Sequence, residues 1–149
     1  MTYDRPVSTC GTSATDLAGE IAAALAAASL VFNQNKAYSN QLIRAAQGLF
    51  DSAKNNKNHG TYSSNKECGG EASGFYNSTS YLDELAWGST WLFFATGDFS
   101  RLQYATDTFQ LALNDKALDN RVFDWNNKIA ANAVSNLHKS FCPSGLLWC

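Results

Sequence analysis

Two adjacent carboxylates, Asp83 and Glu84, lie in the stretch of the sequence that is richest in groups able to do chemistry. This stretch is FYNSTSYLDELAWGSTW, residues 75–91, and it also carries two tryptophans one helical turn apart, Trp87 and Trp91. Aromatic rings beside carboxylates suggest a sugar site, because glycoside hydrolysis typically uses two carboxylates that flank the bond to be cut.

The spacing of the two carboxylates argues against a catalytic pair. Adjacent residues on a helix point about 100° apart around its axis, so Asp83 and Glu84 are not expected to act on one sugar oxygen pair. They can instead stabilise the N-terminal end of their helix or pair with distant cations. Contact with a metal or a substrate is the other interpretation that the sequence leaves open.

Two further aromatic residues, Tyr76 and Trp125, are candidate sugar contacts. Tyr76 precedes the helix that carries the acids, and Trp125 lies in the segment FDWNNK, at the expected start of a later helix. Each ring offers a flat apolar face to a sugar, but a lone tyrosine is more often a core residue, and Trp125 has the same two interpretations. Trp87 and Trp91 share one helix face and are expected to serve packing.

The composition predicts one globular domain and excludes some classes of function. Hydrophobic residues make up 45% of the 149 residues and charged residues 16%, which suits a packed core. The formal net charge of −2 and the absence of a Lys/Arg cluster argue against a nucleic-acid-binding surface. We find no serine–histidine–acid arrangement and no glycine-rich phosphate loop, and no cofactor is expected.

The spacing of the cysteines argues against a zinc site, and the length of the apolar runs argues against a membrane span. Cys10, Cys68, Cys142 and Cys149 lack the spacing of a zinc site, and they could be disulfides or buried thiols. The longest apolar run, residues 21–32, is shorter than the roughly 20 residues that cross a bilayer. The N-terminal residues do not read as a signal peptide, so the sequence itself holds no targeting signal and no membrane segment.

The hydrophobic periodicity predicts an all-α chain of about five helices. The glycine-rich stretch 55–74 is expected to be a long loop, of a length that is often functional. The first helix is expected to begin near Ser13 or Thr15, either of which could cap it. The other helices are expected over residues 37–54, 80–96, 99–113 and 123–137. Gly97 is expected to end the third helix, and Asp98 or Ser100 to cap the fourth.

The helices alternate in character. The first and third are apolar on most sides, whereas the second and fourth are amphipathic, and the pattern repeats after about 65 residues. Such alternation suits an α/α toroid, in which inner helices are buried on both sides and outer helices on one. About five helices would supply less than half of a closed ring, so we expect large apolar faces and poor stability in isolation.

Several stretches together resemble glycoside hydrolase family 9, and in particular plant endo-β-1,4-glucanases. The most specific is FYNSTSYLDELAWGSTWLFFATGD, and DLAGEIAAALAAASLVF, AYSNQLIRAAQGLF and FDWNNK follow the family's pattern in the same order. The resemblance covers roughly residues 3–135. The short form YNSTSYLDE is most similar to the membrane-anchored plant subgroup.

The resemblance implies part of an (α/α)6 barrel and an inverting cut of internal β-1,4-glucosidic bonds in cell-wall glucan. In the family, an aspartate pair in a DAGDY motif acts as the base and a glutamate near the C-terminal end as the acid. Neither motif occurs in residues 1–149, so we expect a partial catalytic domain without catalytic residues, inactive alone. By resemblance the complete protein would be secreted to the cell wall or anchored in a membrane.

The resemblance carries few site residues over. Tyr76 and Trp125 match positions that contact glucose units in family members, whereas Thr79 stands where many members have an aromatic residue. Some bacterial members bind calcium through the acid pair, but here the loop is one residue shorter and a later aspartate ligand is not evident, so no metal is expected. The alternative to a cellulase piece is a non-catalytic helical module that binds glucan or a protein partner.

Overall fold

Four long helices make up most of the part of the chain that the computed structural model describes, which is residues 10, 14–115, 117 and 122–133. They are α1 (Thr15–Val31), α2 (Lys36–Lys54), α4 (Leu82–Thr96) and α5 (Phe99–Leu113). Three short helical segments lie between α2 and α4: η1 (Tyr62–Ser64), α3 (Lys66–Gly69) and η2 (Gly70–Gly74). Among these described residues no β-strand occurs, and the prediction of an all-α chain is confirmed.

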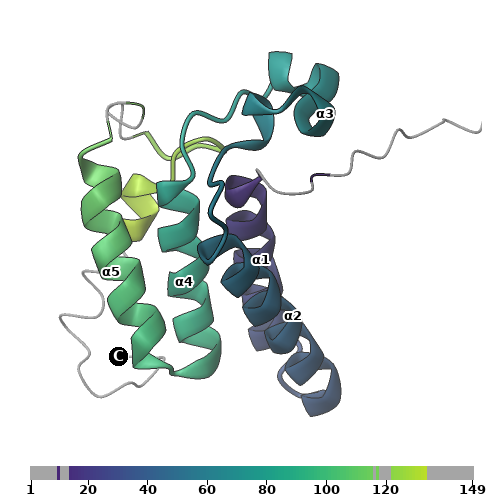
Figure 1. The fold of residues 1–149 in the computed structure, drawn as a ribbon. Coiled ribbons are helices and arrows are strands. Elements are labelled where there is room, and N and C mark those ends of the chain that lie inside the picture. The colour runs from purple at the N-terminus through teal and green to yellow at the C-terminus, as the bar shows by residue number, and fades with distance from the viewer. Residues whose placement is uncertain (1–9, 11–13, 116, 118–121, 134–149) are drawn as a thin grey trace, which may run out of the picture.

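The long helices form two antiparallel hairpins that lie side by side. Figure 1 shows α4 between α5 and α1, with α2 against α1 and the short segments at the top of the view. The two helices predicted as inner, α1 and α4, are therefore direct neighbours, and the amphipathic α2 and α5 lie on their outer sides. This is the alternation expected of an α/α barrel.

The core between the hairpins is built from small and large side chains in turn. Ala22 and Ala26 of α1 are fully buried, and so are Phe50 of α2 and Leu92 of α4. Alanine on α1 lets α4 approach closely, and Phe50 fills the space that the small residues leave. Glycines bring the helices closer still, since the Cα of Gly19 faces the backbone of α4.

Two helix ends follow the sequence prediction and one does not. Gly97 ends α4 with a φ of +73°, which glycine adopts without strain, and the Asp98 carboxylate caps α5 by accepting from the Ser100 N–H. The expected cap of α1 is wrong: Ala14 occupies that position, and the Thr15 N–H donates instead to the Gly60 carbonyl at 2.9 Å. A distant loop thus replaces the local cap.

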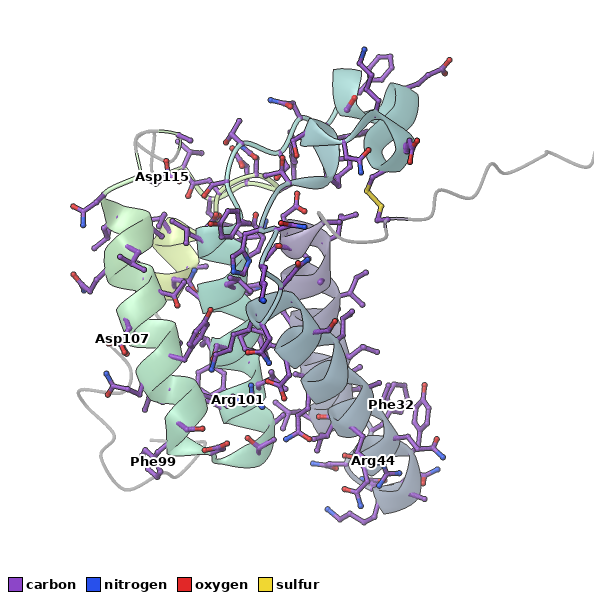
Figure 2. All side chains as sticks on the ribbon, in the orientation of Figure 1. Phe32, Arg44, Phe99, Arg101, Asp107 and Asp115 are labelled. Atoms are coloured by element: carbon purple, nitrogen blue, oxygen red, sulfur yellow. A yellow bond between two sulfur atoms is a disulfide. The ribbon has the colours of Figure 1, made fainter. Side chains whose placement is uncertain are left out.

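The glycine-rich connector is more ordered than a plain loop. Its short helices are anchored to α1, because the Asp16 carboxylate accepts from the Tyr62 N–H at 3.0 and 3.1 Å. A disulfide joins Cys10 to Cys68 of α3 (Figure 2), which settles one of the alternatives left open by the sequence. Cys142 and Cys149 lie outside the described residues.

The last expected helix begins later than predicted. Residues 122–128 form a turn closed by paired backbone hydrogen bonds between Asp124 and Asn127, and helix appears only from Ile129. The Asp124 carboxylate accepts from the Asn126 N–H at 2.8 Å, a local bond that competes with helix formation. Trp125 therefore belongs to a turn and not to a helix start.

Candidate functional site

Tyr76 and Trp125 meet at the surface although 49 residues separate them in the sequence. Their ring centroids are 5.7 Å apart with the ring planes at 84°, an edge-to-face arrangement. Tyr76 is 59% exposed and Trp125 49% exposed, so neither is a core residue. We call these two side chains the aromatic pair. Of the two possibilities that the sequence left for each ring, the structure supports the accessible one.

A hydrogen-bonded clamp holds the two loops of the aromatic pair together. The Asn126 Oδ1 accepts from the Thr79 N–H at 2.9 Å, and its Nδ2 donates to the Thr79 Oγ1, also at 2.9 Å. Both bonds use one planar amide, which fixes the relative orientation of the two segments. Thr79 does not supply the aromatic surface that many family members have here, but it fastens the loop that carries Tyr76.

Serine and tyrosine side chains support the Tyr76 loop from the other side. The Ser63 Oγ donates to the Ser78 carbonyl at 2.7 Å and accepts from the Ser78 N–H at 3.1 Å. The Tyr62 hydroxyl donates to the Tyr76 carbonyl. Because Asp16 of α1 holds Tyr62, the loop is connected through η1 to the helical scaffold.

Lys128 lies beneath Trp125 with its ammonium group almost fully buried. The Nζ donates to the carbonyls of Asp124 at 3.0 Å and Trp125 at 2.6 Å. It also pairs with the Glu20 Oε1 of α1 at 2.6 Å. The Lys128 backbone N–H donates to the Asp83 Oδ2 at 2.7 Å, so both ends of this residue are fixed.

The acid pair is buried below the site and does not reach its surface. Asp83 is fully buried and Glu84 is 2% exposed. The two carboxyl groups are close enough for each to influence the pKa of the other. The Asn132 amide donates to the Asp83 carbonyl at 3.0 Å, which ties the following helix to α4.

Burial gives the acid pair unusual protonation. Desolvation raises the pKa of Asp83 above its ordinary value. Desolvation and then the neighbouring Asp83 carboxyl raise the pKa of Glu84 to about 10. Lys128 opposes both shifts, but more weakly. At neutral pH the Glu84 carboxyl therefore keeps its proton.

The residues around the acid pair do not fit a calcium site like that of the bacterial family members. Asp83 Oδ1, Glu84 Oε2 and Asn132 Oδ1 are buried acceptors without a hydrogen-bond partner among the described residues. The proton on Glu84, however, removes one of the two negative charges that a hard cation would need. No third acidic, histidine or cysteine side chain joins them in the described residues, and the Lys128 ammonium already supplies positive charge nearby.

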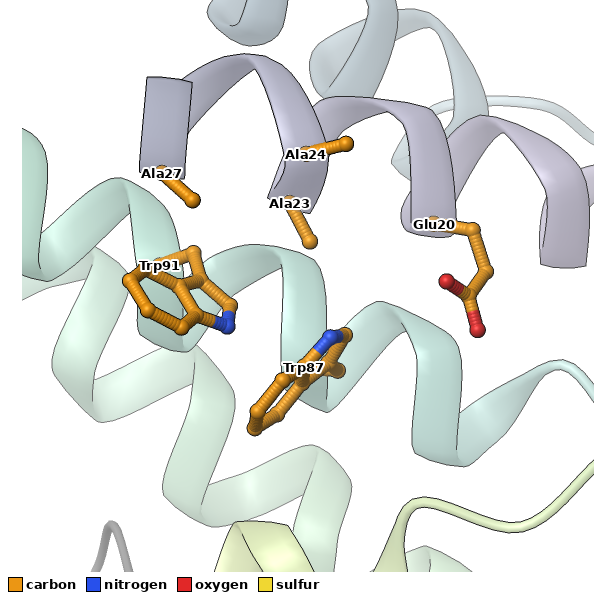
Figure 3. A pocket seen from close by; sticks show the side chains of 6 residues that line it. All are labelled: Glu20, Ala23, Ala24, Ala27, Trp87 and Trp91. Carbon is orange, nitrogen blue, oxygen red and sulfur yellow. The ribbon is translucent and has the colours of Figure 1, made fainter. Parts of the chain in front are cut away.

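Trp87 and Trp91 face α1 from α4 and border an open groove of about 200 Å³. Figure 3 shows their indoles opposite Ala23 and Ala27, with the Glu20 carboxylate at one end. The two rings contact each other edge to face at 5.6 Å. Their packing role was predicted from the sequence, but the groove beside them was not.

No helix in the described part of the chain is long and apolar enough to cross a membrane.

Sequence reasoning missed the residues that hold the aromatic pair in place. Asn126 and Lys128 are visible only as letters of FDWNNK, and Ser63 lies in a polar stretch without a pattern. A lysine three residues after a tryptophan is the one available signal, since it can bond back to the turn that precedes it. The partners of Asn126 and Ser63 depend on tertiary structure.

The sequence profile of Glycosyl hydrolase family 9 matches residues 1–142, which is nearly the whole chain. The chain therefore belongs to glycosyl hydrolase family 9, as its resemblance predicted. Among its relatives are Endoglucanase 12 of Oryza sativa subsp. japonica, 44% identical over 133 residues, and Endoglucanase 25 of Arabidopsis thaliana, 40% identical over 134 residues.

Both plant alignments cover 87% of this chain but only 20% and 21% of the relatives, so the chain spans about one fifth of their length. The solved endoglucanase of the termite Nasutitermes takasagoensis superimposes with a TM-score of 0.71 and 36% identity, over 88% of this chain and 28% of that one.

Cellulase Cel9M of C. cellulolyticum in complex with cellobiose gives a TM-score of 0.67 and 27% identity, over 87% and 29% of the two chains. The fold is thus part of an (α/α)6 barrel.

Proposed function

We propose that this chain is a glucan-binding part of an endoglucanase catalytic domain, with the aromatic pair as its sugar-contacting surface. The complete domain would hydrolyse internal β-1,4-glucosidic bonds of cell-wall glucan. Membership of the family supports this substrate class, and so does the cellobiose complex of the similar Cel9M. Residues 1–149 would form one partial domain, in which Tyr76 and Trp125 bind glucose units.

The observation that carries the proposal is the exposure and geometry of the aromatic pair. Two large rings remain about half exposed although the chain has a core nearby in which to bury them. A glucose ring presents flat C–H faces, and stacking on aromatic faces removes apolar area from water on both partners. Edge-to-face rings offer two surfaces at nearly right angles, which suits a chain of glucose units that turns as it crosses the site.

Hydrolysis is assigned to segments other than these 149 residues. The inverting mechanism needs a base and an acid whose carboxyl groups are about 6.5–9.5 Å apart, with room for a water between them. Asp83 and Glu84 are buried beneath the surface, where a glucan does not reach them. We therefore expect the purified chain to leave carboxymethylcellulose intact, and measurable release of reducing sugar by it would contradict this.

We also propose where the complete protein acts and that it belongs to the membrane-anchored plant subgroup. The Cys10–Cys68 disulfide suits an oxidising compartment such as the cell exterior, which supports action at the cell wall. Membrane anchoring of the complete protein rests on the short loop form YNSTSYLDE alone.

Calorimetric titration with cellotetraose tests the binding function. Wild-type chain should bind, and Tyr76→Ala and Trp125→Ala should each weaken binding by about 1 kcal/mol or more, the scale of an aromatic contact. Tyr38→Ala is the matched control, since Tyr38 is another exposed tyrosine but lies on α2. Equal binding by all three variants and the wild type would refute the proposed surface.

A protein partner is the second candidate function. The groove beside Trp87 and Trp91 is apolar, open and formed by inner helices that a complete barrel would cover. Capture of a protein that is unaffected by Tyr76→Ala and Trp125→Ala, together with failure to bind cellotetraose, would favour this alternative.

A further inference from the structure

The Lys128 ammonium lies in a nest of oxygens of the kind that holds a metal ion. Its three neighbours are the carbonyls of Asp124 and Trp125 and the carboxylate of Glu20, at 3.0, 2.6 and 2.6 Å. An ammonium group has three N–H donors and no acceptor, so each donor has one partner. The side chain is only 6% exposed, which makes these bonds strong and their loss costly.

The nest is formed by the turn that positions Trp125. Two of its three oxygens are backbone carbonyls of that turn, three and four residues before the lysine. Without a cation, these carbonyls would point at one another and at a carboxylate in a buried space, and the turn would have to open. The conformation of the backbone at Trp125 therefore depends on a positive charge at this point.

The same residue is fixed to both inner helices. Its ammonium pairs with Glu20 of α1, and its backbone N–H donates to Asp83 of α4. The two hydrogen bonds between Asn126 and Thr79 fix the Tyr76 loop relative to this turn. A continuous set of bonds thus leads from the helical scaffold through Lys128 to both members of the aromatic pair.

We infer that Lys128 is a positioning residue for sugar binding, whose ammonium serves as a built-in cation that sets the Trp125 turn without any bound metal. The inference rests on the proposed function for its effect on sugar affinity, but its effect on the turn does not. Calcium would have to displace a lysine that is paired with Glu20 and bonded to two carbonyls, so we expect the same geometry of the aromatic pair with calcium and with chelators.

The test uses the 149-residue chain labelled with 5-fluorotryptophan and observed by ¹⁹F NMR, with the Trp125 resonance assigned by Trp125→Phe. Lys128→Met keeps the length of the side chain and removes its charge and donors. Lys57→Met is the matched control, because Lys57 is an exposed lysine. The Trp125 resonance should move in Lys128→Met and stay in Lys57→Met. Lower global stability alone would not move the resonance of the folded state.

Affinity and metal dependence complete the experiment. Cellotetraose affinity should fall about tenfold or more in Lys128→Met and remain unchanged in Lys57→Met. Wild-type affinity should be the same in excess EDTA and in millimolar calcium chloride. An unmoved Trp125 resonance in Lys128→Met would overturn the inference, and so would wild-type binding that requires calcium.

Two outcomes distinguish a failure of this inference from a failure of the proposed function and from loss of the fold. If wild type does not bind cellotetraose but the Trp125 resonance moves in Lys128→Met, the proposed function fails and the positioning role stands. If Lys128→Met loses its helical circular dichroism, Lys128→Gln replaces it, since this change removes the positive charge and the reach to the two carbonyls but keeps a polar side chain. A Trp125 resonance that moves in Lys128→Gln supports the role, and one that does not move refutes it.

Discussion

Replacing Gly19 with alanine should push the two inner helices apart. An added Cβ at Gly19 would lie 2.7 Å from the Glu84 carbonyl oxygen and 2.8 Å from its carbonyl carbon. Both atoms belong to the backbone of α4, so no side-chain rotation can relieve the contact. Since ordinary contacts of a Cβ begin near 3.4 Å, the helices must separate by several tenths of an ångström.

The size of the effect follows from two opposing contributions. Overpacking a tight contact costs about 1–3 kcal/mol, and a rigid backbone neighbour argues for the upper part of that range. Alanine gains roughly 1 kcal/mol over glycine inside a helix. We expect a net loss of about 1–2 kcal/mol in the free energy of unfolding.

Gly48 provides the control for the helix-propensity contribution. It is exposed in the middle of α2, and an added Cβ would meet nothing within 4 Å. Gly48→Ala should therefore stabilise the chain by about 0.5–1 kcal/mol. Urea unfolding followed by helical circular dichroism measures both variants. A Gly19→Ala chain as stable as Gly48→Ala would show that the close helix approach is wrong.

Three further predictions concern charge and covalent links. Folded Glu84 keeps its proton until about pH 10 whereas an unfolded glutamate loses it near 4.5, so the free energy of unfolding should fall as pH rises between these values. Glu84→Gln should flatten that decline in urea unfolding at pH 5 and pH 8, and an unchanged slope would contradict the assignment. The Asp51 carboxylate accepts two hydrogen bonds from Arg101, which lower its pKa, and Asp51→Asn should cost about 0.5–1 kcal/mol at pH 7. That cost should disappear as acid protonates Asp51 in the wild type, and a cost independent of pH would exclude the ion pair as its source. The Cys10–Cys68 disulfide closes a separation of 58 residues, so Cys68→Ser should cost about 4 kcal/mol by loop entropy, with equal melting of wild type and variant speaking against a formed disulfide.

Helix type and order could be predicted because they depend on local patterns. The apolar faces of α1 and α4 and the one-sided pattern of α5 follow from residue spacing, and Gly97 and Asp98 carry their own stop and start signals. The start of α1 was predicted close to its place, but its cap could not be found in this way, since the first N–H donates to the carbonyl of Gly60, 45 residues away.

The candidate site was predictable only in part, for the same physical reason. Tyr76 and Trp125 stand out by residue type and by family resemblance, but their meeting depends on how two loops fold together. The late helix start at Ile129 was missed because turn bonds around Asp124 outweigh a helical pattern in the same residues. The buried lysine nest was missed because two of its oxygens are backbone atoms, which a sequence does not distinguish.

The most direct test of a glucan-binding aromatic pair is a cellotetraose titration of the 5-fluorotryptophan-labelled chain. Trp125 lies at the proposed surface, whereas Trp87 and Trp91 lie between α4 and α1 and serve as internal controls. A saturable shift of the Trp125 resonance, with Trp87 and Trp91 unchanged, is the predicted result. A titration that leaves Trp125 in place, or that moves only Trp87 and Trp91, would contradict the account.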